Sequence, residues 1–110
     1  MALHNMTFRF SGKSDGASIP ASFSHTGVVG SGDLEILLTQ ADLGGGVEVQ
    51  ITTPVRGFDS VWEKILGRFV AESSLANVKI HLNDNNATPF VVSLRLKQAL
   101  AEAAERGRTV

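Results

Sequence analysis

The fold is decided by residues 47–70, which read VEVQITTPVRGFDSVWEKILGRFV. Residues 47–51 alternate apolar and polar side chains, which is the period of a β-strand with one buried face. From residue 58 to residue 70 the apolar side chains instead recur three and four positions apart, which predicts an amphipathic helix. A strand followed directly by a helix therefore lies at the centre of the chain.

Segments on both sides repeat the strand pattern, and turn-forming residues separate them. The expected strands are residues 7–10 at a sheet edge, 26–29, 34–40 and 78–82. The Ser-, Gly- and Pro-rich residues 11–22 are expected to form a loop, residues 83–86 a turn, and residues 42–46, which end in three glycines, a hairpin turn.

The C-terminal segment fits two patterns. Thr88 and Pro89 have the residue types of a helix N-cap and a first helical position, and apolar residues follow at helical spacing. Residues 92–97 also alternate in polarity, as a strand would. The Ala- and Glu-rich continuation favours the helix, because both residue types have high helix propensity.

Together these segments predict an α+β fold, with a mainly antiparallel β-sheet and two helices packed on one face. A chain of 110 residues is long enough for one modest core. We expect a single domain over residues 6–106, with short tails at residues 1–5 and 107–110.

Composition excludes several classes of protein. The net charge is −1, whereas a nucleic-acid-binding domain normally carries a basic excess. The chain has no cysteine, so it has neither disulfides nor a thiolate metal site. No apolar run has membrane-spanning length and the N-terminal residues lack the apolar core of a signal peptide, so we expect a cytoplasmic protein without membrane contact.

Basic residues near the C-terminus are interrupted by Glu102 and Glu105, and this pattern indicates a solvated helix face followed by a tail. They are Arg95, Lys97, Arg106 and Arg108.

The three histidines, His4, His25 and His81, have no metal-ligand spacing, so no metal site is predicted. A catalytic set of Ser31, His25 and Asp33 would lack an oxyanion hole and a substrate pocket. No catalytic residue is therefore predicted.

Residues 57–61, GFDSV, resemble the Gly-x-Asp-Ser-Leu signature at which conventional four-helix acyl carrier proteins receive phosphopantetheine. Strands rather than a long helix precede Ser60, unlike in those carriers. Capping explains the two polar residues instead: Asp59 or Ser60 is expected to cap the helix, and Ser60 with Glu63 has capping-box spacing.

Residues 28–38, VVGSGDLEILL, place Ser31 between Gly30 and Gly32. Glycines on both sides leave the hydroxyl unshielded and allow close approach to the backbone. A serine without an adjacent base is a poor nucleophile, so any chemistry at Ser31 would be activated by another protein. From spacing alone, a tight turn is the favoured interpretation.

The same stretch, followed by VEVQITT, VWEKILGRFV, VKIHLND and ATPFVVSLRLKQALAEA, is similar in order and spacing to the acyl carrier (δ) subunits of malonate decarboxylase. The resemblance runs from about Met6 to Glu105. Its Ser-Gly-Asp core is shared with the γ subunits of citrate lyase, whereas the longer Val-Gly-Ser-Gly-Asp-Leu-Glu string favours the malonate enzyme.

The resemblance implies that Ser31 carries 2′-(5″-phosphoribosyl)-3′-dephospho-coenzyme A through a phosphodiester bond made by a nucleotidyltransferase. It implies that acetyl and malonyl groups travel on the cofactor thiol between an acyl transferase subunit and decarboxylase subunits. Gly30, Gly32 and Asp33 are expected to support the turn. For Asp33, recognition by the modifying enzyme and hydrogen bonding within the turn both stay open.

Three alternatives remain at this stage. The first is the equivalent carrier of a citrate lyase-like complex, with the same site and cofactor but a different acyl group. The second is a small non-covalent protein-interaction domain, with Ser31 in an ordinary turn. The third is a conventional phosphopantetheine carrier modified at Ser60.

Overall fold

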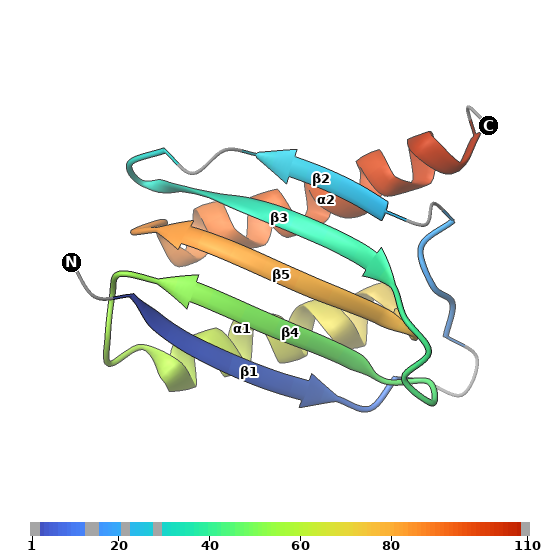
Figure 1. Cartoon of the computed structure of the whole chain (residues 1–110), viewed down its shortest axis with the longest axis horizontal. Helices are drawn as coiled ribbons and strands as arrows, with labels where there is room; N and C mark the ends of the chain where they lie inside the picture. The colour runs from blue at the N-terminus through green and yellow to red at the C-terminus, as the bar shows by residue number, and fades with distance from the viewer. Residues whose placement is uncertain (1–2, 13–15, 21–22, 28–29, 109–110) are drawn as a thin grey trace.

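The computed structural model describes residues 3–12, 16–20, 23–27 and 30–108, which form a five-stranded sheet with two helices on one face (Figure 1). The elements follow in the order β1 (His4–Phe10), β2 (Phe23–Gly27), β3 (Asp33–Gln40), β4 (Val47–Thr53), α1 (Asp59–Ser73), β5 (Val78–Asn85) and α2 (Pro89–Arg108). The predicted α+β fold, with a mainly antiparallel sheet and two helices on one face, is confirmed.

The strand order is β1-β4-β5-β3-β2, and only the neighbours β4 and β5 run parallel. Strand β5 therefore lies between β3 and β4, so the predicted hairpin turn at residues 42–46 is wrong. The segment instead connects two non-adjacent strands and is held by Asn77, whose Oδ1 accepts hydrogen bonds from the amides of Leu43 at 3.0 Å and Gly45 at 2.9 Å. Alternation shows which face of a strand is buried, but not which strand lies beside it.

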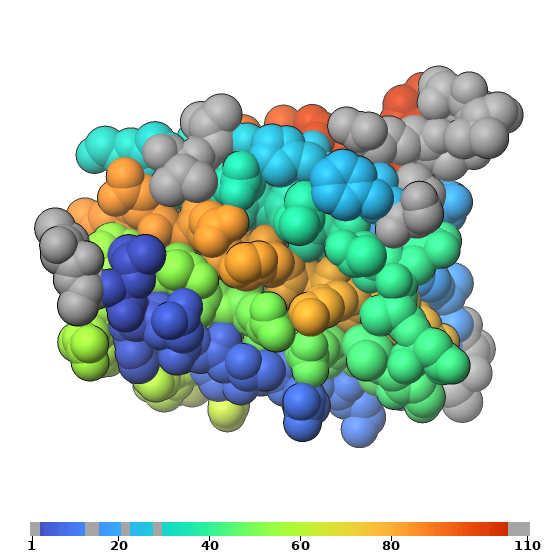
Figure 2. Space-filling model, viewed as in Figure 1, coloured from blue at the N-terminus to red at the C-terminus, as the bar shows by residue number. Residues whose placement is uncertain are grey.

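One face of the sheet and both helices enclose the core. Helix α1 connects the parallel strands β4 and β5 and contacts β1, while α2 lies against β2 and β3. The opposite face carries side chains of β1, β4, β5 and β3 that the helices leave uncovered (Figure 2). The fully buried strand residues of the core are Leu34, Ile36, Leu38, Val47, Val49, Ile51, Val78, Ile80 and Leu82.

Several boundaries differ from the sequence expectation. His4 and Asn5, expected in a tail, belong to β1 and pair with β4, and α2 extends to Arg108. Residues 83–85, expected in a turn, continue β5, and the turn falls at Asn86, with a φ of +66°. Of the expected strand 26–29, the last two residues lie outside the described part of the chain, as do residues 13–15 and 21–22 of the expected loop.

The helical interpretation of the C-terminal segment is confirmed. Thr88 Oγ1 accepts a hydrogen bond from the amide of Val91 at 3.3 Å, and the Thr88 carbonyl accepts one from the amide of Val92 at 3.0 Å. Proline fits the position that follows, because the first helical turn leaves its amide groups without helical partners. In the described part of the chain, neither helix is long and apolar enough to cross a membrane.

Candidate functional site

The turn between β2 and β3 exposes Ser31 to solvent. The amide of Asp33 donates to the carbonyl of Gly30 at 3.0 Å, and the amide of Gly32 donates to the carbonyl of Asn85, at the end of β5, at 2.8 Å. Gly32 has a φ of +75°, which glycine adopts without steric cost, and apart from its chain neighbours no described residue has an atom within 4 Å of the position a Cβ would take there. Residues 30–33, called the Ser31 turn below, therefore have an anchored backbone and an open side.

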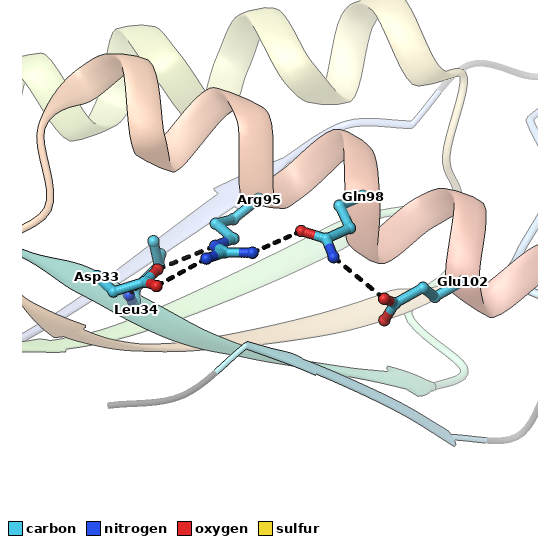
Figure 3. Close-up of polar contacts among 5 residues, drawn as sticks. All are labelled: Asp33, Leu34, Arg95, Gln98 and Glu102. Carbon is cyan, nitrogen blue, oxygen red and sulfur yellow. Dashed lines mark hydrogen bonds and ion pairs between the residues drawn. The ribbon is translucent and has the colours of Figure 1, made fainter. Parts of the chain in front are cut away.

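Asp33 fixes the end of this turn to α2. Its Oδ1 accepts hydrogen bonds from the amide of Leu34 at 2.8 Å and from Arg95 Nε at 2.9 Å, and its Oδ2 accepts one from Arg95 Nη2 at 2.7 Å (Figure 3). The bidentate arrangement is the one in which Arg binds a carboxylate most strongly. The bonds from Arg95 and then from the Leu34 amide hold the pKa of Asp33 below its usual value, and Asp33 in turn raises the pKa of Arg95.

Arg95, expected on a solvated helix face, is partly exposed there, as Lys97 is exposed, but it also has a partner in Asp33 that the expectation did not include. Arg95 Nη1 donates to Gln98 Oε1 at 2.7 Å, and Gln98 Nε2 donates to Glu102 Oε1 at 3.2 Å (Figure 3). The other oxygen of Glu102 accepts a short hydrogen bond from Thr26 Oγ1. Side chains of α2 therefore bind β2 and β3, the two strands that the Ser31 turn connects.

The catalytic set of Ser31, His25 and Asp33 is not assembled. His25 Nε2 lies 2.8 Å from Glu35 Oε2, while Asp33 is bound by Arg95 as described. Asn83 Nδ2 donates to the second oxygen of Glu35 at 2.8 Å. The bonds from His25 and then from Asn83 lower the pKa of Glu35.

Ser60 lies in the first turn of α1 and is exposed. The N-cap residue is Phe58, and no side chain caps the helix, so the expected cap by Asp59 or Ser60 is wrong. The Asp59 carboxylate instead lies 3.6 Å from His4 Nε2. An acidic side chain in the first turn still interacts favourably with the helix dipole.

A cavity of about 380 Å³ lies between the N-terminal turns of the two helices and the end of β5. Most of its wall is apolar. The lining residues are Val55, Phe58, Val61, Trp62, Ile65, Asp84, Asn86, Ala87, Thr88, Pro89 and Val92. Because two separate segments, residues 55–65 and 84–92, contribute to it, no local sequence pattern could have indicated this cavity.

Other kinds of site are not supported by the side chains whose positions are described. Among them, no group of three His, Asp or Glu residues could hold a metal ion. The sequence did not indicate the partnership of Arg95 with Asp33 either, since 62 positions separate the two residues. A spacing signal exists only for residues within a few positions of each other on one element.

Comparison with protein families places most of the chain in one group. The family model described as "Malonate decarboxylase delta subunit (MdcD)" matches residues 22–103. The "Malonate decarboxylase acyl carrier protein" of Malonomonas rubra is 47% identical over 108 residues, covering 98% of this chain and 96% of that protein. The protein of the same name from Xanthomonas campestris pv. campestris (strain B100) is 44% identical over 98 residues, covering 89% of this chain and 92% of that protein.

A solved structure has the same fold. It is a chain of the crystal structure of a Pseudomonas malonate decarboxylase hetero-tetramer in complex with malonate. Its TM-score is 0.71 and its sequence identity is 32%, and the match covers 94% of this chain and 99% of that one.

Proposed function

The chain belongs to the malonate decarboxylase delta subunit family, whose matched relatives are acyl carrier proteins, and on this premise we propose that it carries acyl groups on a prosthetic group attached to Ser31. The group we propose is 2′-(5″-phosphoribosyl)-3′-dephospho-coenzyme A, joined by a phosphodiester. When bound, it supplies a thiol on which acetyl and malonyl are carried as thioesters.

One observation carries the choice of Ser31. Its side chain is exposed on a turn whose backbone is anchored to β5, and the space beside Gly32 is open. A hydroxyl in this position has room for a bulky substituent and for the enzyme that attaches it. The fit of the residues to the prosthetic group therefore supports the proposal.

In the attachment reaction, Ser31 provides only the oxygen that becomes part of the phosphodiester. Ser31 Oγ forms the new bond to phosphorus, the leaving group departs from that phosphorus, and the hydroxyl proton goes to a base of the modifying nucleotidyltransferase. Neither candidate base from the sequence is assigned this role, because Asp33 is bound by Arg95 and His25 contacts Glu35.

The partners we propose are the acyl transferase subunit and the decarboxylase subunits of a malonate decarboxylase, together with that nucleotidyltransferase. The solved hetero-tetramer that contains a chain of this fold supports an assembly of several subunits. In such an assembly a tethered thioester meets each active site at an effective concentration on the order of millimolar, so the carrier needs no catalytic group of its own.

The test is the intact mass of the chain from two sources. The first is a host that makes active malonate decarboxylase, and the second is a host without the cofactor-synthesis enzymes. The mass of one prosthetic group should be added in the first host only. An unmodified chain within an active decarboxylase would refute the proposal.

A further inference from the structure

We propose that the apolar cavity beside the Ser31 turn holds the acetylated end of the prosthetic arm and excludes the malonylated end, an inference that rests on attachment at Ser31. The cavity would then separate the two acyl forms of the carrier. The neutral form would be sheltered within this chain, and the charged form would be free to enter an active site.

The walls have the composition of a small-molecule site. Such sites are mostly apolar, with a few polar groups, and have volumes of about 300–1,000 Å³. This cavity is about 380 Å³, and its wall includes the buried residues Trp62 and Val92, which are 6% and 1% exposed. Phe58, which is 51% exposed, lies at the rim and gives the entrance an apolar edge.

Two structural links place the cavity next to the attachment point. The amide of Gly32 is bonded to the carbonyl of Asn85, and the next residue, Asn86, lines the cavity. On α2, Arg95 binds Asp33, and Val92, one turn earlier, lines the cavity. An arm attached at Ser31 therefore starts within a few residues of the entrance.

The charge of the wall separates the two acyl groups. Among the described residues that line the cavity, Asp84, which is 5% exposed, is the charged one, and none is Lys, Arg or His. Its carboxylate accepts hydrogen bonds from Thr53 Oγ1 at 2.8 Å and from the amides of Asn86 at 3.2 Å and Ala87 at 3.0 Å. A malonyl carboxylate brought inside would lose its water and meet a like charge, whereas an acetyl group has no charge to desolvate.

Weak intrinsic affinity is enough for this role. A covalent tether of this kind gives an effective concentration on the order of millimolar, so a millimolar dissociation constant already fills about half of the cavities. Exclusion of water from the sheltered thioester then slows its hydrolysis in proportion to occupancy.

Trp62 provides a direct readout, because it is the only tryptophan of the chain and lines the cavity. We would prepare the apo, acetyl and malonyl forms, verify each by intact mass, and record the Trp62 emission spectrum of each. We would also measure the hydrolysis rate of each thioester on the protein relative to the same thioester of the free cofactor. The acetyl form should have a Trp62 emission spectrum that differs from that of the apo form, and its thioester should hydrolyse up to about twofold more slowly than that of the free cofactor. The malonyl form should have the emission spectrum of the apo form, and its thioester should hydrolyse at the rate of the free malonyl cofactor.

A matched pair of variants tests the location. Ala87→Phe places a large side chain in the cavity and should remove the protection of the acetyl thioester. Ala101→Phe adds the same side chain to an exposed position on α2, and this variant should retain the protection of the acetyl thioester. If Ala87→Phe does not fold, the comparison of the acetyl and malonyl forms of the unaltered chain still tests whether the cavity holds the acetyl group.

The outcomes separate this inference from the proposed function. A loaded chain whose acetyl and malonyl forms have equal Trp62 emission and equal relative hydrolysis would refute the cavity's role and leave attachment at Ser31 intact. An emission change that occurs only when a partner subunit is added would indicate that the cavity binds that partner. This result would also refute the cavity's role in holding the acetyl group and leave attachment at Ser31 intact. A chain that never gains the prosthetic group at Ser31 would refute both proposals.

Discussion

Ser31 and Ser60 are both exposed and lie close to an aspartate, and the backbone around them is held differently. Ser31 is part of a glycine-bounded turn that β5 and α2 anchor from both sides. Ser60 is part of the first turn of α1, and its neighbour Asp59 has a carboxylate that is 61% exposed and 3.6 Å from His4. Exposure alone therefore does not distinguish the two serines.

The difference lies in what surrounds the hydroxyl. Gly32 leaves open space beside Ser31, so a modifying enzyme can approach the backbone closely. At Ser60 the backbone is helical and neighbouring side chains project from the same turn. If Ser31 is the attachment point, as we propose, the carrier site of this chain is an anchored turn, and not a helix start as in the conventional carriers that residues 57–61 resemble.

The largest expected effect comes from removing each hydroxyl in turn. Ser31→Ala should abolish malonate-dependent release of carbon dioxide by the reconstituted complex, because no attachment point remains. Ser60→Ala should keep full activity, which makes it the matched control. The reverse pattern would assign the attachment site to Ser60. Full activity of both variants would exclude both serines as the attachment site.

Two glycines with left-handed backbone test the backbone here: Gly32 within the Ser31 turn and Gly27 at the end of β2. A Cβ at Gly27, with a φ of +82°, would lie 2.4 Å from the carbonyl oxygen of Leu34, whereas a Cβ at Gly32 meets no atom within 4 Å. Gly32→Ala should reduce the free energy of unfolding by roughly 1–2 kcal/mol, the cost of the left-handed conformation. Gly27→Ala should cost clearly more because a clash is added, and urea unfolding of both variants checks this order.

Helix α2 has a side-chain cap at its start and α1 has none, and the free energy of unfolding should show this difference. Thr88→Ala removes the hydroxyl that accepts the Val91 amide and should cost about 1 kcal/mol. Ser60→Ala removes a side chain that makes no cap and should leave the unfolding free energy nearly unchanged. An equal loss in both variants would mean that Ser60 stabilises α1 in a way its contacts do not show.

The smallest effect concerns the ion pair of the Ser31 turn. Because the pKa of Asp33 is lowered in the folded chain, its contribution to stability is complete above the unfolded value of about 3.9 and is lost as the pH falls through the folded pKa. The stability difference between the unaltered chain and Arg95→Gln should therefore be constant near pH 7 and shrink below about pH 3.9. Lys97→Gln, which removes an exposed cation from the same helix, should not change this profile, and a difference independent of pH would contradict the role of the pair.

Much of the fold was predictable because its signals are local. Residues 47–51 alternate, residues 58–70 have helical spacing, and Thr88 with Pro89 marks the start of α2, so strands and helices were assigned correctly from neighbouring positions. The strand order was not predictable in this way. Residues 42–46 look like a hairpin turn, but β5, which begins only at Val78, pairs with both flanking strands.

The candidate site was likewise predictable only where its signal is local. Ser31, with a glycine on each side, was evident in the sequence, and the turn is present. Its supports were not evident, since Arg95 comes from α2 and Asn85 from β5, and neither was the cavity, which two segments line. Such contacts exist only after the chain has folded, and Arg95 in particular has the sequence surroundings of an ordinary solvated helix residue.

The central claim is that the prosthetic group is attached to Ser31 and to no other residue. The most direct measurement is fragmentation mass spectrometry of the chain isolated from active malonate decarboxylase, with the peptides containing Ser31 and Ser60 compared. The whole adduct mass should be found on Ser31, and Ser60 should be unmodified. An adduct on Ser60, or an active enzyme whose Ser31 is unmodified, would contradict this claim.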